Sequence, residues 1–539
     1  MRNASDNALR GDARPAYPTL DRIDGALALV AGGLSLALYV RTLAPGLLPG
    51  DSGELQTLSV LLGNTHPTGY PVYLLLGKVF TWLPAGDVAY RVNLLSAVMA
   101  ALTVAGVYLA GRLLTGRRLP ALVGAVALAI SPSFWSQAVI AEVYTPGAAF
   151  LAAVLVCLLV WDATRTPRYL FMAGVLGGLS LGVHLSVALL APAVGIFLLL
   201  SWWRSRTRGL AVWRPALLGA LTGTGLALVA FLALDWNAPP ANFFDSAVLP
   251  SRSAWGYRAT ELNTPFERLA FNIAGRQFRS LMFADPAEAM PRLSEQYLDN
   301  LPHEFSWWIV GLAGIGLLYL LIRRWRVAVL FLLALAVHWA YMFNYDIWDF
   351  YVFLIPGYVL LAILAGAGLG GLVDGLRRLV PWSVGRLVAE PALVVAIVAV
   401  GVWPIFAPNM LLIRIGRPAF NFDGYPADSF GMTGVHSQAT AVVRALDKDA
   451  IVFTDWYWLY PFYYAAYVEQ GRTNLMFIET TPYVEDGGLA DSVLPYVRDR
   501  LPGHPIFFSK RQPKMMAVGY TLLPVYVGPM TLYRVQLPR

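Results

Sequence analysis

The chain has 539 residues, of which 57% are hydrophobic and only 14% are charged. Soluble domains carry about 25% charged residues, so this composition and a mean hydropathy of +0.56 exclude an ordinary soluble protein. The net charge of +7 does not indicate nucleic-acid binding, because the basic residues alternate with apolar spans, and the single cysteine, Cys157, excludes a disulfide framework and a cysteine metal site.

Eleven apolar segments are candidates for membrane spans, since a spanning helix needs about 20 apolar residues. The third and the fifth segments are short, and the first is expected to be an anchor rather than a cleaved signal peptide, because no clear small-residue cleavage site follows it. The segments are 24–43, 92–111, 119–135, 139–161, 169–184, 185–203, 213–234, 305–322, 327–344, 350–373 and 389–408.

Arginines fix the expected orientation. They precede the first span and follow every second span, and loops rich in Arg or Lys stay in the cytoplasm. The sequence therefore predicts a multi-pass protein of the cell (inner) membrane with a cytoplasmic tail over 1–23 and a transmembrane domain over 24–408. The outer loops are then 44–91 and 235–304.

The sequence changes character after about residue 409, where charged residues and short β-type runs appear. Two such runs are 450–454 and 505–508, and turn residues lie between them. They predict a small extracytoplasmic α/β domain over 409–539. The expected fold class is a polytopic α-helical membrane protein of about eleven transmembrane helices with this small domain at its end.

The first outer loop contains two carboxylates three residues apart, Asp51 and Glu54. On a helix they would share one face, which suits general-base catalysis or a divalent cation such as Mg²⁺ or Mn²⁺. Helix capping by Asp51 or Ser52 is the alternative, and it does not exclude a catalytic role. The stretch 70–83 is apolar but too short to span, so it predicts an interfacial or re-entrant helix.

Two further residues of this loop have open alternatives. His66 lies in a turn rich in Pro and Gly, where a lone histidine is more often structural. Arg91 lies at the outer mouth of the second span, where it either snorkels to the interface or binds a phosphate.

Arg276, in the loop 235–304, lies in an expected amphipathic helix at 263–283, and a lipid phosphate contact or a solvated helix face would each explain it.

Ionisable side chains recur at the other outer connections. Glu142 lies near the apolar region, where an ionisable group is costly and marks a functional site. His184 lies between the fifth and sixth spans, and Asp346 and Asp349 lie between the ninth and tenth. An aromatic belt would equally explain their Trp and Tyr neighbours. Acids or histidines at four outer connections predict one cavity that opens outward.

Several motifs together resemble a known family. The chain is similar to glycosyltransferase family 117, long of unknown function in bacteria and related to a vertebrate protein O-mannosyltransferase, within the GT-C superfamily. The similarity is dense over 50–190, although Thr68 replaces the proline expected after His66-Pro67. The motifs are Gly50-Asp51-Ser52-Gly53-Glu54-Leu55, His66-Pro67-Thr68-Gly69-Tyr70-Pro71, Tyr90-Arg91-Val92-Asn93-Leu94-Leu95, Phe134-Trp135-Ser136-Gln137 through Tyr144, Leu181-Gly182-Val183-His184 and Tyr345-Asp346-Ile347-Trp348-Asp349.

This resemblance implies an inverting membrane enzyme. It would move a sugar, mannose favoured, from a polyprenyl-phosphate carrier to a hydroxyl of Ser or Thr in an exported protein, or to a lipid or cell-wall glycan. Asp51 would be the base, with Glu54 beside it, and a divalent cation on this pair stays open. Together with the outer-face pattern, the resemblance gives as substrate-binding residues His66, Tyr70, Arg91, Gln137, Glu142, Tyr144, His184, Arg276, Asp346 and Asp349.

Two other classes of protein compete with this interpretation. A transporter or flippase of lipid-linked sugars predicts charged residues at mid-span and repeated halves with broken helices, and the sequence shows neither. A non-catalytic scaffold would explain the C-terminal domain but not the acids at several outer connections.

Overall fold

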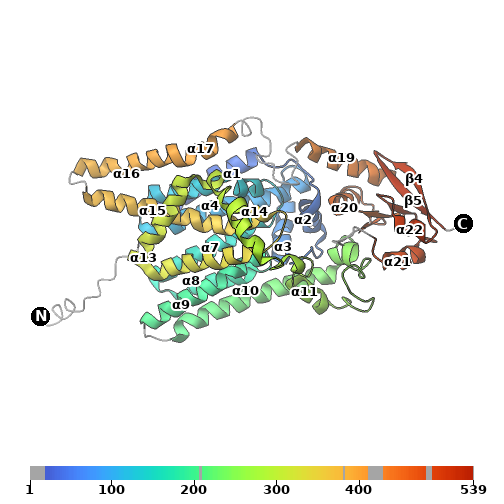
Figure 1. Cartoon of the computed structure of the whole chain (residues 1–539), viewed down its shortest axis with the longest axis horizontal. Coiled ribbons are helices and arrows are strands. Elements are labelled where there is room, and N and C mark those ends of the chain that lie inside the picture. The colour runs from blue at the N-terminus through green and yellow to red at the C-terminus, as the bar shows by residue number, and fades with distance from the viewer. Residues whose placement is uncertain (1–17, 206–208, 380–382, 411–428, 481–488, 538–539) are drawn as a thin grey trace.

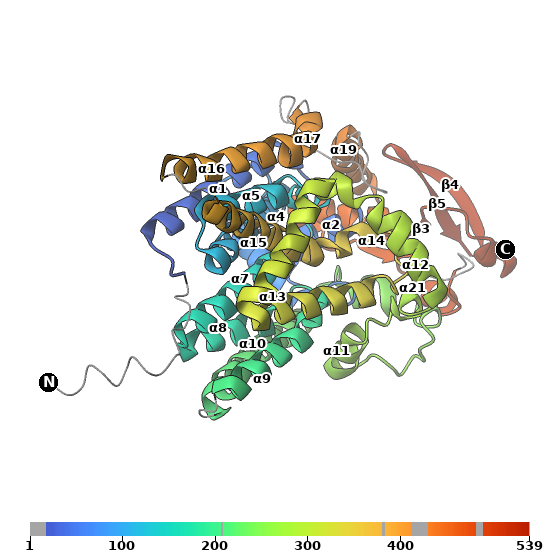
Figure 2. The ribbon, with the colours of Figure 1, turned by 60° about the vertical axis from the view of Figure 1, so that its left-hand side comes forward.

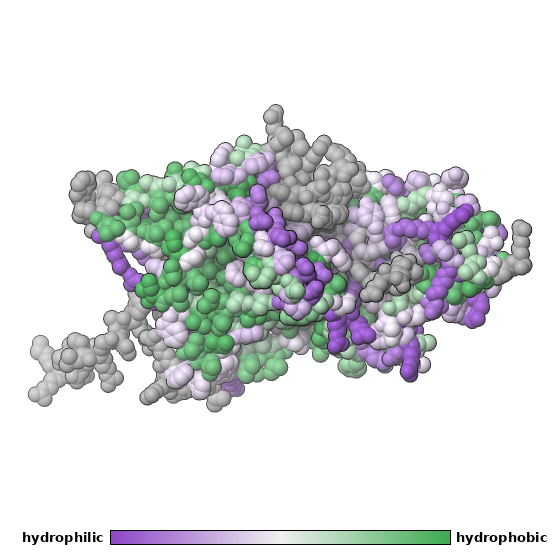
Figure 3. Space-filling model, viewed as in Figure 1, coloured by the Kyte–Doolittle hydropathy of each residue, from purple (hydrophilic) through white to green (hydrophobic). Residues whose placement is uncertain are grey.

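The computed structural model describes residues 18–205, 209–379, 383–410, 429–480 and 489–537. A bundle of long helices ends in a small sheet domain that carries the C-terminus (Figure 1). Apolar side chains cover the face of the bundle seen in Figure 3, whereas hydrophilic ones gather toward the sheet domain. Leu29, Leu221 and Ile322 are 78%, 70% and 83% exposed. Apolar exposure of this extent fits a surface that faces lipid.

Eight helical segments in the described part of the chain are long and apolar enough to cross a membrane, and α5 with α6 would form a ninth although the two bend by 68°. A polytopic helical membrane protein is therefore confirmed. The bundle consists of α1 (Arg22–Arg41), α4 (Val88–Thr115), α5 (Arg118–Ala129), α6 (Pro132–Ala138), α7 (Tyr144–Thr164), α8 (Pro167–Ser180), α9 (Ala191–Ser205), α10 (Gly209–Asn237), α13 (Leu301–Met342), α15 (Ile355–Leu379) and α16 (Ser383–Ile397).

One of these helices, α13, corresponds to two of the expected spans. Its 42 residues would extend about 63 Å at 1.5 Å per residue, roughly twice the ~30 Å thickness of the hydrocarbon core. The backbone leaves the helical conformation at Arg324, and Figure 2 shows two legs that diverge from a turn. The legs match the expected spans 305–322 and 327–344, and α8 matches the short fifth span.

Ion pairs join the helices at the end of the bundle away from the sheet domain. Arg324 and Arg326, at the turn of α13, lie 3.1 and 3.4 Å from the carboxylate of Asp162 in α7. Arg117, before α5, pairs with Asp374 of α15. Buried charges need such partners. The arginines used to predict the orientation thus also hold helix ends together.

Helices α13 and α15 approach each other at two glycines. A Cβ atom at Gly316 would lie 1.9 Å from the carbonyl oxygen of Leu364, and one at Gly368 would lie 1.9 Å from that of Leu312. Small residues allow helix backbones to come this close inside a membrane. The packing of the two helices therefore depends on the absence of side chains at both positions.

The C-terminal domain contains a five-stranded sheet in the order β2-β1-β3-β5-β4. β1 (Ile451–Thr454) is parallel to β2 (Met476–Glu479) and β3 (Ile506–Phe508). The antiparallel strands are β4 (Thr521–Val527) and β5 (Met530–Gln536). The runs expected at 450–454 and 505–508 are confirmed as β1 and β3, whereas the expected boundary near 409 borders residues 411–428, outside the described residues.

Apolar contacts cover both faces of this sheet. Side chains of α19 (Ser429–Ala445) and α20 (Trp456–Tyr463) pack on one face. Side chains of α21 (Val493–Arg500) and α22 (Pro513–Ala517) pack on the other face. Because α20 follows β1 directly and contacts α2, the carboxyl end of β1 lies near the helix bundle.

The sheet domain contacts the segment between α1 and α4 through α20 and α2 (Gly50–Leu61). The Thr57 hydroxyl donates to the carbonyl oxygen of Tyr460 at 3.1 Å. A Cβ atom at Gly53 would lie 2.5 Å from the carbonyl oxygen of Leu48 and 3.3 Å from Cδ of Pro461. The stretch expected at 70–83 forms the short apolar helix α3 (Pro71–Thr81) beside α2.

Replacement of Gly316 by leucine is expected to lower the free energy of unfolding by about 1–3 kcal/mol, the usual cost of overpacking. Gly314 provides the matched control, because a Cβ atom there meets nothing within 4 Å. Chemical denaturation of the purified protein in detergent compares Gly316→Leu with Gly314→Leu. Equal unfolding midpoints for the two variants would contradict the close packing of α13 and α15.

Candidate active site

Asp51 lies in the first turn of α2, and its side chain is 49% exposed. Its Oδ1 atom accepts a hydrogen bond of 2.6 Å from the indole nitrogen of Trp456, the first residue of α20. Its Oδ2 atom lies 3.9 Å from Nε2 of His66, beyond hydrogen-bond length. The N-cap of α2 is Pro49 and no side chain caps this helix, so the alternative that Asp51 or Ser52 serves as a cap is wrong.

Glu54 lies one turn further along α2, and its side chain is fully buried. Its Oε1 atom accepts hydrogen bonds from the backbone nitrogen of His66 at 2.8 Å and from the hydroxyl of Tyr460 at 3.1 Å. Its Oε2 atom lies 2.5 Å from Nδ1 of His66. Both oxygens are thus engaged, and Glu54 orients His66 instead of facing a substrate.

His66 is buried between these carboxylates. Burial alone would lower its pKa, but the negative charges of Glu54 and Asp51 outweigh that effect and raise the pKa from its ordinary value of 6.5 to about 9. The hydroxyl of Tyr70 lies 3.1 Å from Nε2 and donates to the carbonyl oxygen of Pro67. That hydroxyl therefore accepts from Nε2, which places a hydrogen on both ring nitrogens.

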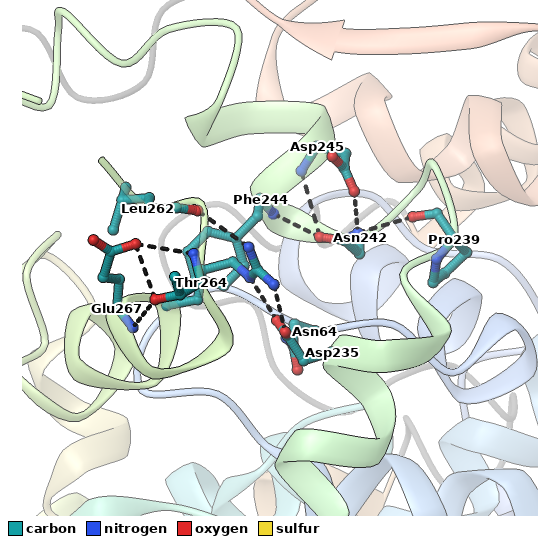
Figure 4. A network of polar contacts seen from close by, with 10 residues as sticks. Asn64, Asp235, Pro239, Asn242, Phe244, Asp245, Leu262, Thr264 and Glu267 are labelled. Atoms are coloured by element: carbon teal, nitrogen blue, oxygen red, sulfur yellow. Dashed lines mark hydrogen bonds and ion pairs between the residues drawn. The ribbon is translucent and has the colours of Figure 1, made fainter. Parts of the chain in front are cut away.

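The turn that carries His66 is fixed by a polar network (Figure 4). Asn64 donates to Asp235 at the end of α10 at 2.8 Å, and the carbonyl oxygen of Asn64 accepts from the backbone nitrogen of Phe243. Arg268 in α11 (Pro265–Ile273) binds the same Asp235 carboxylate through two nitrogens, at 2.7 and 2.6 Å. These hydrogen bonds hold the segment after α10 against the turn that carries His66.

Two more carboxyls face the site from other connections. Glu142 was expected near or within the apolar region, at the connection between the third and fourth spans. Because α7 begins only at Tyr144, Glu142 lies in that connection. Burial and the charge of Asp51 raise its pKa well above the ordinary value. Asp349 accepts a hydrogen bond of 3.2 Å from the Tyr144 hydroxyl, and burial together with the charge of Asp51 raises its pKa to about 7.

His184 faces the site in a different protonation state from His66. Its Nδ1 atom lies 2.6 Å from the Ser186 hydroxyl, and its ring stacks on Tyr70 with centroids 6.2 Å apart. Burial and the charge of His66 lower its pKa to about 4. His184 is therefore neutral at physiological pH.

These side chains surround one cavity of about 310 Å³, at the lower end of the range of small-molecule sites, about 300–1,000 Å³. No Lys or Arg is among the described residues that line it. Seven of the residues expected at a site line this cavity, namely Asp51, His66, Tyr70, Glu142, Tyr144, His184 and Asp349. The cavity expected from four outer connections is thus present.

Comparison with known proteins connects this cavity to a family. Residues 51–207 match the family model described as the N-terminal domain of protein O-mannosyl-transferase TMEM260. The mouse protein O-mannosyl-transferase TMEM260 is 30% identical over 150 residues, which are 28% of this chain and 21% of the mouse protein. The relative from Dictyostelium discoideum is 28% identical over 127 residues, 23% of this chain and 15% of that protein. The matched region thus spans about a fifth or less of these relatives.

Solved structures of other proteins superpose on most of this chain. ArnT from Cupriavidus metallidurans, in the apo state, superposes with a TM-score of 0.52 at 15% identity, over 95% of this chain and 97% of that one. The archaeal oligosaccharyltransferase AglB from Archaeoglobus fulgidus gives 0.54 at 13% identity, over 90% and 69%. The chain has the GT-C fold. Its residues 51–207 are similar to the N-terminal domain of the TMEM260 protein O-mannosyl-transferases, as its motifs predict.

The GT-C fold does not bring every expected residue to the cavity. The Arg91 guanidinium donates to the carbonyl oxygens of Thr81, Ala85 and Gly86, at 2.8, 2.8 and 3.0 Å. Arg91 therefore fixes the chain after α3 and does not line the cavity. The structure therefore does not place Arg91 where a phosphate in the cavity would contact it, and three of its five N–H donors already bond backbone carbonyl oxygens.

Four other expected residues also lie outside the cavity lining, one of them Glu54. Asp346 pairs with Arg292 at 2.9 Å. Arg276 lies over the ring of Tyr257, 5.5 Å from its centroid. The Gln137 amide nitrogen donates to Ser136 at 3.3 Å. These contacts stabilise the connections around the cavity.

The cavity is also lined by residues outside the expected set of site residues. Trp456 arrives from the sheet domain, about 400 residues from Asp51 in the sequence, and only the folded structure joins them. The others with polar side chains are Thr68, Ser186, Gln277, Tyr341, Tyr345 and Trp348. None lies in a spacing that indicates chemistry by itself.

A divalent cation shared by Asp51 and Glu54 does not fit this geometry. Glu54 already accepts two hydrogen bonds and pairs with His66, so it has no oxygen free for an ion. Over the described residues, no group of three or more His, Cys, Asp or Glu side chains is placed to hold a metal ion.

The pair of Glu54 and His66 predicts a pH-dependent stability. A histidine whose pKa is raised on folding stabilises the fold fully below its unfolded pKa, and this contribution is lost as pH rises toward the folded value of about 9. The double variant Glu54→Gln/His66→Gln has neither titrating group. Wild type should therefore lose stability relative to the double variant between about pH 6.5 and 9, as measured by thermal unfolding across that range. Parallel stability profiles of wild type and the double variant would show that folding does not raise the pKa of His66.

Proposed function

We propose that this chain is an inverting membrane glycosyltransferase that moves a sugar, mannose favoured, from a polyprenyl phosphate to a Ser or Thr hydroxyl of an exported protein. The half-exposed carboxylate of Asp51 at the mouth of the cavity carries this proposal. It lies in the region related to protein O-mannosyl-transferases. AglB, which has the same fold, is described in complex with an inhibitory peptide and a dolichol-phosphate. A polypeptide acceptor and a lipid phosphate are therefore compatible with this fold.

Asp51 acts as the general base in this proposal. Its Oδ1 atom is held by Trp456, so Oδ2 is the oxygen that takes the proton of the acceptor hydroxyl. The acceptor oxygen then bonds to the anomeric carbon, and the bond from that carbon to the phosphate oxygen breaks. The phosphate leaves with the electron pair, and the configuration at the anomeric carbon inverts.

The leaving phosphate develops negative charge and needs a positive partner. His66 supplies it, because its pKa of about 9 keeps the ring positively charged at neutral pH. Among the described cavity residues, no arginine or lysine competes for this role. Glu54 is a positioning residue, since it acts on the substrate only through His66.

The cavity wall suits a prenyl chain on one side. Ala188, Leu189, Ile273 and Met282 contribute apolar surface to the lining. The reacting carboxylate lies where the sheet domain meets α2, and the exposed part of Asp51 remains accessible to a polypeptide. A lipid donor and an aqueous acceptor would therefore meet at Asp51 from different sides.

The basic connections support a cytoplasmic N-terminus and a cavity outside the inner membrane for the proposed enzyme. A cysteine-free Cys157→Ser background tests this with single cysteines at two exposed positions, Thr164 at the end of α7 and Asp499 in the sheet domain. A membrane-impermeant maleimide should label Asp499→Cys but not Thr164→Cys in intact cells. The reverse pattern would place the cavity on the cytoplasmic face.

The proposed activity predicts transfer of radiolabelled mannose from polyprenyl-phosphate-mannose to an extract of exported proteins. Asp51→Asn should lose about 10²–10⁴-fold of the rate, the usual contribution of a general base. Asp299→Asn, at an exposed acid outside the cavity, is the matched control and should keep wild-type activity. Equal transfer by Asp51→Asn and wild type would remove Asp51 as the base. The proposed function itself fails if wild type transfers no sugar from any polyprenyl-phosphate donor.

A further inference from the structure

Two buried oxygen atoms in the cavity wall have no hydrogen-bond partner. They are Oε1 of Gln277 and Oδ1 of Asp349, the only such atoms among the described side chains that line the cavity. An unpaired buried polar atom costs about 1–3 kcal/mol. Both positions accept hydrogen bonds, so a ligand that brings donors would remove this cost.

The two side chains belong to one structural unit. Met282 and Tyr345 form an antiparallel bridge between the segment after α11 and the segment before α14 (Phe350–Phe353). The backbone nitrogen of Phe283 donates to the carbonyl oxygen of Asn344 at 2.7 Å, and that of Asp346 donates to Leu281 at 2.9 Å. Gln277 and Asp349 lie a few residues from this bridge, one on each segment. Their relative position is therefore held by backbone contacts.

The same unit is anchored at both ends. Arg292 pairs with Asp346 at 2.9 Å and donates to the carbonyl oxygen of Phe343 at 3.1 Å. At the other end, Arg268 binds Asp235 in the network of Figure 4. The segment with Gln277 is thus tied to the turn that carries His66. A side chain in this place can recognise a ligand without first becoming ordered.

The charges in the cavity indicate which part of a lipid-linked sugar contacts this wall. Asp349 and Glu142 both face the cavity, and no described Lys or Arg balances them. Carboxyl groups without a cation, whether protonated or ionised, offer a phosphate no positive partner, so a phosphate would approach the positive ring of His66 instead. Sugar hydroxyls are neutral and bring the missing donors. Burial raises the pKa of Asp349 to about 7, so this carboxyl can also donate to a hydroxyl.

Aromatic rings complete the environment of a sugar. Tyr144 donates to the second oxygen of Asp349, and Tyr345 packs edge-on against Phe353 with centroids 5.3 Å apart. All four side chains line the cavity. Aromatic faces offer apolar surface to the C–H groups of a sugar ring while the acceptors bind its hydroxyls.

We propose that Gln277 and Asp349 bind hydroxyl groups of the donor sugar and so determine which sugar the cavity accepts. This inference rests on the proposed function, because it takes a lipid-linked sugar as the ligand. It assigns recognition of the sugar to the unit joined by the Met282–Tyr345 bridge, and reaction chemistry to Asp51 and His66.

Measurements of probe binding distinguish sugar recognition by Gln277 and Asp349 from a purely structural role of these residues. The probes are a short-chain polyprenyl-phosphate-mannose and the same polyprenyl phosphate without the sugar, titrated into the purified full chain. Gln277→Leu and Asp349→Leu each remove the acceptor oxygen and should each weaken binding of the mannose-bearing probe about 10-fold, the effect of one lost hydrogen bond. Binding of the sugar-free probe should not change.

Two variants control for size and position. Gln277→Glu keeps the acceptor oxygen and should retain most of the affinity for the mannose-bearing probe. Gln296→Leu makes the same change at an exposed glutamine outside the cavity and should bind both probes as wild type does. Deoxymannose probes add an internal check. The one that lacks the contacted hydroxyl should bind wild type about 10-fold more weakly but Gln277→Leu no more weakly than the mannose probe.

Equal losses for both probes, or no loss for either, would overturn the inference, as would a wild type that does not distinguish them. Failure of the proposed function has a different signature. A wild type that binds the mannose probe with the expected dependence on Gln277 and Asp349, yet transfers no sugar, would overturn the transferase proposal and leave the sugar site in place.

Discussion

The buried contact between Glu54 and His66 is the interaction on which the site depends. A carboxylate without solvent is costly unless it is paired and hydrogen-bonded, and Glu54 satisfies this through His66 and Tyr460. The same contact fixes the His66 ring and keeps it protonated. Because Tyr460 belongs to α20, this buried carboxylate also joins the helix bundle to the sheet domain.

This arrangement gives two neighbouring acids of one motif different tasks. Asp51 and Glu54 are three residues apart on α2, yet one is half exposed and the other fully buried. The difference comes from the sheet domain, which covers Glu54 with Tyr460 and reaches Asp51 only with the indole of Trp456. Asp51, the proposed base, is thus held by Trp456, which lies about 400 residues away in the sequence.

Hydrophobic segments were predictable because lipid imposes a minimum length and satisfied backbone hydrogen bonds. The two legs of α13 and the strands β1 and β3 follow from such local rules. The contact partners of individual side chains do not follow from local rules. Arg91 has the chemistry of a phosphate ligand, but it lies outside the cavity lining and donates to the nearby carbonyl oxygens of Thr81, Ala85 and Gly86.

For Gln277 the sequence predicted no role at all, because a single glutamine in a loop rich in arginine does not indicate a function. Its significance lies in an unpartnered atom inside a cavity, and burial of one atom is a property of the fold. Outer-side acids such as Glu142 and Asp349 were predictable as a group, because ionisable residues near lipid are costly. Their separate roles required the geometry.

A structure of the full chain with a non-transferable polyprenyl-phosphate-mannose analogue tests the account most directly. The account predicts the phosphate beside His66 and the anomeric carbon facing Oδ2 of Asp51. It also predicts the sugar against Gln277 and Asp349. A phosphate bound by Arg91, or a sugar remote from Asp51, would contradict it.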